Sequence, residues 1–216
     1  MLKRILGLTA FAVCIAVLLN TGTITGGEKK KDKKDDPKYN NPTFVPTADE
    51  VIEKMFEMAK VNKDDVIFDL GCGDNRICFM AAKKYRARGV GIETNPVRIK
   101  EAMEMFEKYN KDDAISYGGS IKLPLVETRH GDALAIKDLK DATVVVMYMF
   151  PEFMDLWFPI AEKTLKPGTR IVSHDYSWTK GWEPTATATV KSSTRDNHKA
   201  ILWIVPEKKK KKAANE

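Results

Sequence analysis

The chain has 216 residues, enough for one domain with a full hydrophobic core, and its hydrophobic share of 43% excludes a wholly disordered protein. The formal net charge of +6 comes from the two ends. Residues 1–38 carry eight Lys and Arg against four acids, residues 207–216 carry five Lys against two Glu, and residues 39–206 therefore sum to −1. A nearly neutral body does not support a nucleic-acid-binding surface, so no nucleic acid is expected as a partner.

The N-terminal segment, residues 1–27, has the charged start and apolar run of a secretory signal peptide. Lys3 and Arg4 precede the apolar run at residues 5–19. As a helix this run would be about 22 Å long, shorter than a hydrocarbon core of about 30 Å. Weakly polar residues up to Ile24 would complete a membrane span. A signal peptide and a signal anchor are therefore both compatible with this segment.

Two lysine-rich segments flank the body of the chain. Residues 28–42 are predicted to be a charged flexible linker and residues 207–216 a disordered tail, because neither has an apolar face. Residues 43–206 form the one predicted domain. If the N-terminal segment stays uncleaved, the six lysines of the linker favour a membrane-associated protein whose body faces the cytoplasm. Cleavage of a signal peptide would instead export the body.

The body alternates helical and strand patterns. A helix is predicted to begin at Thr47, where Thr47 and Glu50 have the spacing of a capping box. Further helices are predicted at residues 76–85, 96–109 and 151–165, and a surface loop at 110–122. The predicted strands are residues 66–70, 89–92, 125–129, 142–148, 170–174, 186–191 and 199–205. This order predicts an α/β fold with a mostly parallel seven-stranded sheet, helices on both faces and a C-terminal antiparallel hairpin.

The spacing of the cysteines and histidines does not indicate a disulfide framework or a metal site. The residues concerned are Cys14, Cys72, Cys78, His130, His174 and His198. The cysteines form neither a disulfide framework nor a zinc pattern, and no two histidines have the spacing of a ligand pair. No metal is therefore expected.

The stretch "VIFDLGCGDNRI", residues 66–77, is the most informative in the chain. An apolar strand is followed by a turn with Gly71 and Gly73, at the edge of the sheet where α/β proteins bind ligands. A dinucleotide fingerprint would have a third glycine where Arg76 stands. That glycine permits close packing around a diphosphate, so its absence argues against a dinucleotide site.

The acids around this turn indicate a cationic ligand. Asp69 precedes the turn and Asp74 follows it, and both would repel a phosphate. S-adenosylmethionine (SAM) carries a sulfonium and an ammonium group, which suit such a site. We therefore expect Asp69, Gly71, Cys72 and Gly73 to bind SAM.

Two further strand ends carry matching signals. Glu93 ends the second predicted strand in "GVGIET", where a carboxylate can accept hydrogen bonds from both ribose hydroxyls. Asp132 and Ala133 follow the third strand in "GDAL", where the acid can accept from the adenine amino group and a backbone N–H can reach a ring nitrogen. The alternative is that Asp69, Glu93 and Asp132 only terminate strands and cap helices.

The motifs "VIFDLGCGDNRI", "GVGIETNPVRIKEA" and "GDAL" resemble the successive SAM motifs of class I methyltransferases, across residues 43–205. With "FVPTADEVIEKMFEMAKVNKDD" and "LKPGTRIVSHDY" the chain resembles the group of ATP-synthase c-subunit and archaeal broad-specificity protein-lysine methyltransferases. The resemblance implies a Rossmann-like fold, SAM as methyl donor, and Pro46 and Thr47 closing over its methionine end. Phe44 replaces the usual Tyr, and Asn75 the usual Gly, although Asn tolerates a left-handed backbone.

The methyl acceptor is expected after the fourth strand, in "MYMFPEF". This segment lacks the Asn/Asp-Pro-Pro-aromatic pattern of enzymes that methylate base amino groups. Tyr148, Phe150 and Phe153 are predicted to form an aromatic slot for a lysine side chain, with Glu152 to hold the cation or take a proton. A strand end packed on the following helix is the alternative.

Asp175 in "SHDYSW", with its neighbour Tyr176, is a further candidate for the acceptor pocket. Tyr148, Glu152 and Asp175 are thus the candidate catalytic residues. A monomeric protein-lysine methyltransferase is the leading hypothesis. A small-molecule methyltransferase and a non-catalytic SAM-binding module at a membrane remain as alternatives.

Overall fold

The computed structural model describes residues 44–112 and 125–208 of the chain. The predicted signal segment and linker, most of the predicted surface loop and most of the lysine-rich tail lie outside the described residues, so those expectations stay predictions. Among the described helices, none has the length and apolar character needed to cross a bilayer.

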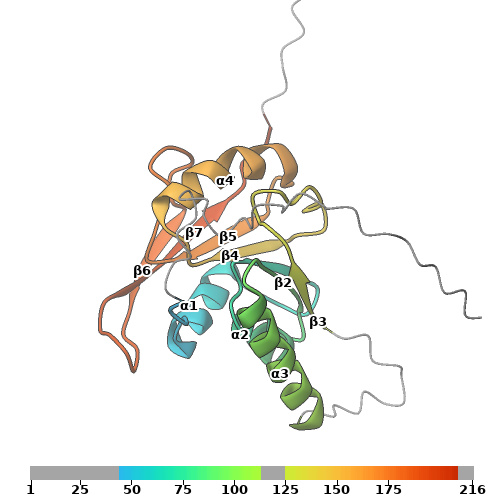
Figure 1. Cartoon of the computed structure of the whole chain (residues 1–216). Coiled ribbons are helices and arrows are strands. Elements are labelled where there is room, and N and C mark those ends of the chain that lie inside the picture. The colour runs from blue at the N-terminus through green and yellow to red at the C-terminus, as the bar shows by residue number, and fades with distance from the viewer. Residues whose placement is uncertain (1–43, 113–124, 209–216) are drawn as a thin grey trace, which may run out of the picture. The chain divides into compact units, whose positions relative to one another are not determined.

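The described residues contain one seven-stranded sheet with the order β3-β2-β1-β4-β5-β7-β6 (Figure 1). The strands are β1 Val66–Leu70, β2 Arg88–Glu93, β3 Val126–His130, β4 Val144–Met147, β5 Arg170–His174, β6 Ala186–Val190 and β7 His198–Ile204. The first five pair in parallel, and β7 is antiparallel to both β5 and β6. The predicted α/β fold with a C-terminal antiparallel hairpin is confirmed.

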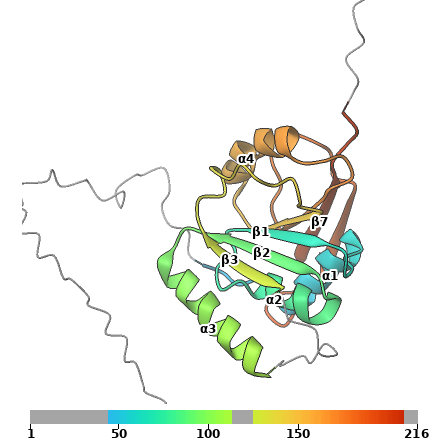
Figure 2. The same ribbon diagram turned by 90° about the vertical axis from the view of Figure 1, so that its right-hand side faces the viewer.

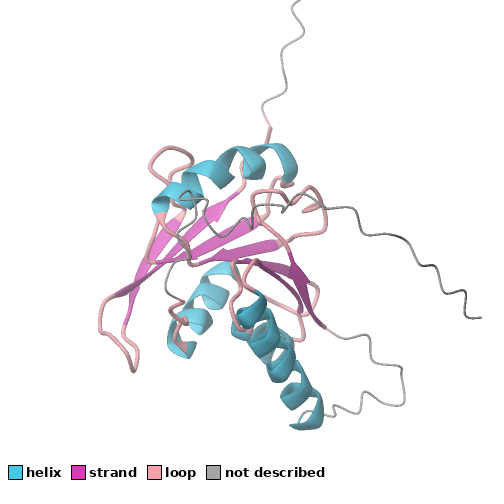
Figure 3. Cartoon of the chain, viewed as in Figure 1, coloured by secondary structure: helices cyan, strands magenta, loops and turns pink. Residues whose placement is uncertain are grey.

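Helices cover both faces of the sheet, as predicted (Figures 1, 2 and 3). The helices are α1 Asp49–Ala59, α2 Arg76–Met80, the π-helical turn η3 Ala81–Tyr85, α3 Pro96–Asp112 and α4 Pro151–Thr164. One face carries α4, whereas α1, α2 and α3 lie on the other.

The alternation of side chains along β1 produces the two cores. Phe68 and Leu70 pack in one core with Trp157 of α4. Ile67 points to the opposite face and packs with Phe56 of α1. Successive residues of a strand point to opposite faces, so this apolar strand buries nearly every side chain and holds its carboxyl end in place between two cores.

The capping box predicted at the start of α1 is wrong. The N-cap residue is Ala48, and no side chain caps the helix. The Thr47 hydroxyl is hydrogen-bonded to His174 Nδ1 at 3.1 Å, and Glu50 accepts a bond from the Ser193 N–H at 3.1 Å. The Thr47 hydroxyl and the Glu50 carboxylate, which would form the capping box, are instead bonded to residues far away in the sequence.

Candidate active site

The glycine turn after β1 has the backbone that its sequence predicts. Gly71 has φ 76° and Gly73 has φ 57°, a left-handed region that glycine enters without steric cost. Asn75 has φ 63°, so the expectation that it tolerates a left-handed backbone is confirmed. The N–H groups of Gly71 and Cys72 both donate to the Ile92 carbonyl, at 2.9 and 3.0 Å. These bonds hold the turn against β2.

Gly91 on β2 permits this close approach. A Cβ atom at this position would lie 2.4 Å from Asn75 Oδ1 and 2.5 Å from Cys72 Sγ. Both distances are shorter than any tolerable contact. The missing third glycine of a dinucleotide fingerprint therefore does not leave the turn loosely packed, because a glycine on the neighbouring strand supplies the space.

The segment before α1 lies over the glycine turn. A Cβ atom on Gly73 would lie 2.0 Å from the Phe44 ring, which shows that the ring is seated directly on the turn. The Arg98 guanidinium lies 4.6 Å from the centroid of the same ring, a cation–π contact. Pro46 is exposed, whereas Thr47 is buried and its hydroxyl is hydrogen-bonded to His174. The lead-in therefore lies against the glycine turn, and the expected closure of Pro46 and Thr47 over the methionine end of SAM stays a prediction.

Asp69 is the buried acid of this site. Among the described residues, its Oδ2 atom has no hydrogen-bond partner. Burial, together with the charges of Asp74 and Glu93, raises the pKa of Asp69 to about 8. Asp74 is matched by Arg76, whose Nη2 lies 2.6 Å from Asp74 Oδ2. Asp69 is thus an unpaired buried carboxyl group whose ionisation a cationic ligand would favour.

Glu93 at the end of β2 has a role that its sequence position did not reveal. Its Oε2 accepts a hydrogen bond from the Gly73 N–H at 2.9 Å. Its Oε1 accepts from the N–H groups of Thr94 and Asn95, both at 2.8 Å. The Thr94 hydroxyl also lies 3.5 Å from Oε1, so only Oε2, which has one partner, keeps a lone pair for a ribose hydroxyl. Glu93 anchors the glycine turn, and the ribose contact stays a prediction.

Asp132 and Ala133 lie next to Glu93 at the same edge of the sheet. The N–H of Gly131 donates to the Glu93 carbonyl at 2.9 Å, which joins the ends of β2 and β3. Asp132 is exposed, and its Oδ1 accepts from the Leu134 N–H at 2.8 Å; Ala133 is buried. The adenine contacts expected of these two residues stay predictions.

An aromatic group lies at the ends of β4 and β5, where the acceptor is expected. Tyr148 and Tyr176 stack with centroids 5.8 Å apart, and the Phe150 ring lies 5.2 Å from Tyr176. Phe150 is 51% exposed and so is accessible to a substrate. Phe153, also predicted to line this slot, is half-buried and packs against the core beneath α4, and its place in the slot stays a prediction. Glu152 is exposed in the first turn of α4.

Asp175 follows β5 with a left-handed φ of 63°. Its Oδ1 accepts from the Lys199 N–H at 2.8 Å, and its Oδ2 lies 2.5 Å from Arg195 Nη2. Burial would raise the pKa of Asp175, but these hydrogen bonds and the Arg195 charge hold it below its usual value. The Arg195 guanidinium already balances the charge of this carboxylate, which favours a positioning role for Asp175 over proton transfer.

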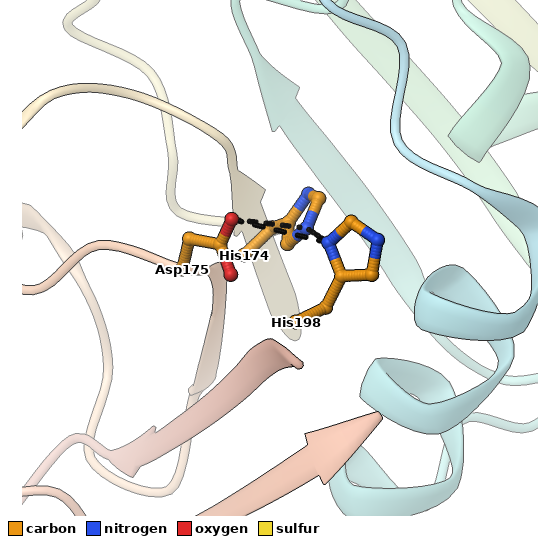
Figure 4. Close-up of side chains that lie close together, drawn as sticks. All are labelled: His174, Asp175 and His198. Atoms are coloured by element: carbon orange, nitrogen blue, oxygen red, sulfur yellow. Dashed lines mark hydrogen bonds and ion pairs between the residues drawn. The ribbon is translucent and has the colours of Figure 1, made fainter. Parts of the chain in front are cut away.

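Two histidines that the sequence analysis treated as unrelated lie side by side here (Figure 4). His174 Nε2 lies 2.8 Å from His198 Nδ1, and both rings are buried. Burial is the main cause that lowers the pKa of His174 to about 4. The Tyr148 ring packs on His174 with centroids 3.9 Å apart, which places this pair directly behind the aromatic group. Their separation of 24 residues matches no local pattern, because the antiparallel pairing of β5 and β7 brings them together.

This sheet order, the acidic glycine turn at the end of β1 and the carboxylate at the end of β2 define a class I SAM-dependent methyltransferase. The orphaned oxygen of Asp69 and the glycine-lined turn fit the cationic methionine end of SAM. The ANTKMT methyltransferase domain matches residues 69–186. The chain belongs to this family.

Individual relatives agree with this class. The chain is 37% identical over 167 residues to a protein-lysine N-methyltransferase of Saccharolobus islandicus, a match that covers 77% of this chain and 95% of that protein. The chain also resembles the crystal structure of an RNA methyltransferase from Salinibacter ruber in complex with S-adenosyl-L-homocysteine (SAH), with a TM-score of 0.65 and 34% sequence identity. This match covers 79% of this chain and 100% of that one. A putative methyltransferase of Escherichia coli shares the fold alone, with a TM-score of 0.56, 14% identity, and coverage of 77% and 90%.

Proposed function

We propose that this methyltransferase transfers the methyl group of SAM to the side-chain nitrogen of a protein lysine. The observation that carries the proposal is the 37% identity to the Saccharolobus islandicus protein-lysine N-methyltransferase across 95% of that protein. The aromatic group at the ends of β4 and β5 supports it, since aromatic rings such as those of Tyr148, Phe150 and Tyr176 suit a lysine stem and its ammonium group.

SAM supplies an electrophilic methyl group when bound, and the residues of the chain hold and orient the two reactants. Asp69 and the glycine turn are placed to hold the methionine end, and Glu93 the ribose. The acceptor amine must be neutral to attack, although the pKa of a free lysine is about 10.4. Contact with Tyr148 and Tyr176 would exclude water from the amine and lower its pKa, which increases the reactive fraction. Fixing both groups in line provides the rest of the acceleration.

RNA is the second candidate acceptor, because the Salinibacter ruber relative is described as an RNA methyltransferase and is matched over 100% of its length. Two features of this chain weigh against RNA. Residues 39–206 carry a formal charge of −1, and the segment after β4 lacks the Asn/Asp-Pro-Pro-aromatic pattern. Lysine is therefore the preferred acceptor.

The test supplies tritiated SAM and the full-length enzyme to a cell lysate divided into protein, RNA and small-molecule fractions. Label in the protein fraction that is recovered as N-methyl-lysine after hydrolysis is the expected result. A Tyr148→Ala enzyme serves as the matched control, since it should still bind SAM but transfer slowly. Label confined to RNA establishes the second candidate, and label confined to small molecules refutes both.

We also propose that the catalytic domain faces the cytoplasm at a membrane. SAM is made in the cytoplasm. In an uncleaved anchor the six linker lysines outnumber Lys3 and Arg4 on the other side of the apolar run, and the positive-inside rule then favours the linker and the body inside. The test is protease treatment of spheroplasts that carry a C-terminal tag. Protection of the tag is expected, and its digestion from outside would refute the orientation.

A further inference from the structure

Three buried or half-buried ligand-type side chains converge where β5 ends and β7 begins (Figure 4). His174 Nε2 lies 2.8 Å from His198 Nδ1 and 3.5 Å from Asp175 Oδ2. His198 Nδ1 lies 3.9 Å from the same carboxylate oxygen. The three atoms come from three different side chains and lie within 3.9 Å of one another.

We propose that His174, Asp175 and His198 bind one divalent transition-metal ion, with Zn²⁺ as the preferred ion. The point equidistant from the three ligand atoms lies about 2.0 Å from each, which agrees with Zn–N and Zn–O bonds of about 2.0–2.2 Å. Two imidazoles and one carboxylate are a ligand set of zinc and iron sites, whereas Mg²⁺ and Ca²⁺ prefer oxygen ligands.

The remaining polar atoms of these side chains have the partners expected around a metal site. His174 Nδ1 is bonded to Thr47 Oγ1 at 3.1 Å, and His198 Nε2 to Ser192 Oγ at 2.9 Å. The second oxygen of Asp175 accepts from the Lys199 N–H at 2.8 Å. Metal-binding histidines nearly always use their other ring nitrogen in a hydrogen bond, which fixes the ring and its tautomer. Here all three ligands are oriented in this way before any ion arrives.

The backbone of Asp175 points to the same function. Its φ of 63° is uncommon for a residue other than glycine, although Asp adopts it more readily than most. Such conformations are often found at functional sites. The turn directs the carboxylate back toward the imidazoles of His174 and His198 rather than into solvent.

Arg195 shows that the cluster attracts a cation. Its Nη2 atom lies 2.5 Å from Asp175 Oδ2 and 3.0 Å from His198 Nδ1, so the guanidinium uses two of the three proposed ligand atoms. The side chain is 46% exposed and belongs to the loop between β6 and β7, so it can withdraw when a metal ion binds. Arg195 is thus the internal competitor of the metal.

A metal at this position would connect functional parts of the domain. His174 and His198 lie on β5 and β7, and Asp175 directly follows β5. Thr47 in the lead-in is bonded to His174, and the Tyr148 ring packs on His174 with centroids 3.9 Å apart. The ion would cross-link the start of β7 to the end of β5, directly behind the aromatic group. This role does not depend on which acceptor the enzyme methylates.

The experiment uses the full chain purified without a polyhistidine tag. Equilibrium dialysis with Zn²⁺ followed by elemental analysis should give one ion per chain, and Co²⁺ should give visible absorption bands. Mg²⁺ at the same concentration should give no uptake. Zn²⁺ should also raise the unfolding temperature, since an ion that binds the folded state stabilises it.

Substitutions test the ligands. His174→Ala, His198→Ala and Asp175→Asn should each lower the affinity for Zn²⁺ at least tenfold and abolish the Co²⁺ bands. His130→Ala is the matched control, because the chain has three histidines and this one lies outside the cluster. Arg195→Ala should bind Zn²⁺ several-fold more tightly than the wild type. Absence of stoichiometric Zn²⁺ in the wild type, or equal uptake by a correctly folded His198→Ala chain, overturns the proposal.

Discussion

Replacing Glu93 with Gln should weaken SAH binding about 5- to 150-fold, equivalent to about 1–3 kcal/mol. The carboxylate accepts three backbone N–H bonds, at 2.9, 2.8 and 2.8 Å. A hydrogen bond to a charged group contributes about 1.5–3 kcal/mol. Gln keeps one acceptor oxygen and turns an NH₂ group toward an N–H donor, so at least one of these bonds is lost and the glycine turn is released.

Calorimetric titration with SAH measures this effect, with Glu162→Gln, an exposed site on the far part of α4, as the control. Titration with a 2′,3′-dideoxy analogue of SAH separates the two roles of Glu93. If the carboxylate also accepts from the ribose, the substitution should cost less affinity for the analogue than for SAH. An SAH affinity within twofold of the wild type would refute both roles.

Four further outcomes are expected. The pKa of Asp69 is raised to about 8, so the folded, ligand-free protein holds a proton that the unfolded chain releases near pH 4. The stability of the fold should therefore fall as the pH rises from about 4 to 8. Asp69→Asn should flatten that slope in thermal melts. Tyr148→Ala should lower the transfer rate more than the SAM affinity, and wild-type transfer should rise from neutral pH to roughly 9–10 as the amine deprotonates; equal losses in rate and affinity would contradict the acceptor contact. Gly91→Ala should cost about 1–3 kcal/mol of stability by overpacking the turn, measured by urea unfolding; an unchanged midpoint would show that the turn relaxes freely. Calorimetry should detect SAM binding and no NAD binding, and tighter NAD binding would disprove the interpretation of the turn.

The strands and helices were predictable because their signals are local. The bounds of β1 and β5 are those predicted, since turn residues precede each strand, Asp64 and Asp65 before β1 and Pro167 and Gly168 before β5. Most other elements differ from the prediction by one to three residues, as with α3, which continues to Asp112. The left-handed Asn75 was also predictable, because its backbone preference is a property of the residue itself.

The binding edge of the sheet was predictable for a related reason. Parallel strands bring their carboxyl ends to one edge, so Asp69, Glu93 and Asp132 had to gather there once the alternation of strands and helices was recognised. The bonds that these acids make were not predictable. Glu93 accepts a hydrogen bond from the Gly73 N–H, twenty residues away in the chain, and no sequence pattern describes that contact.

By itself, the sequence therefore determined the class of fold, the ligand edge and the acidic character of the site, because periodicity, turn residues and strand-end acids act over a few residues. Only the tertiary structure decided which distant side chains meet. Thr47 was predicted to cap its own helix, yet its hydroxyl is bonded to His174, 127 residues away. His174 and His198 became a pair only because β7 runs antiparallel between β5 and β6. Strand order and register, set by the packing of the whole sheet, bring such groups together, and no local spacing encodes them.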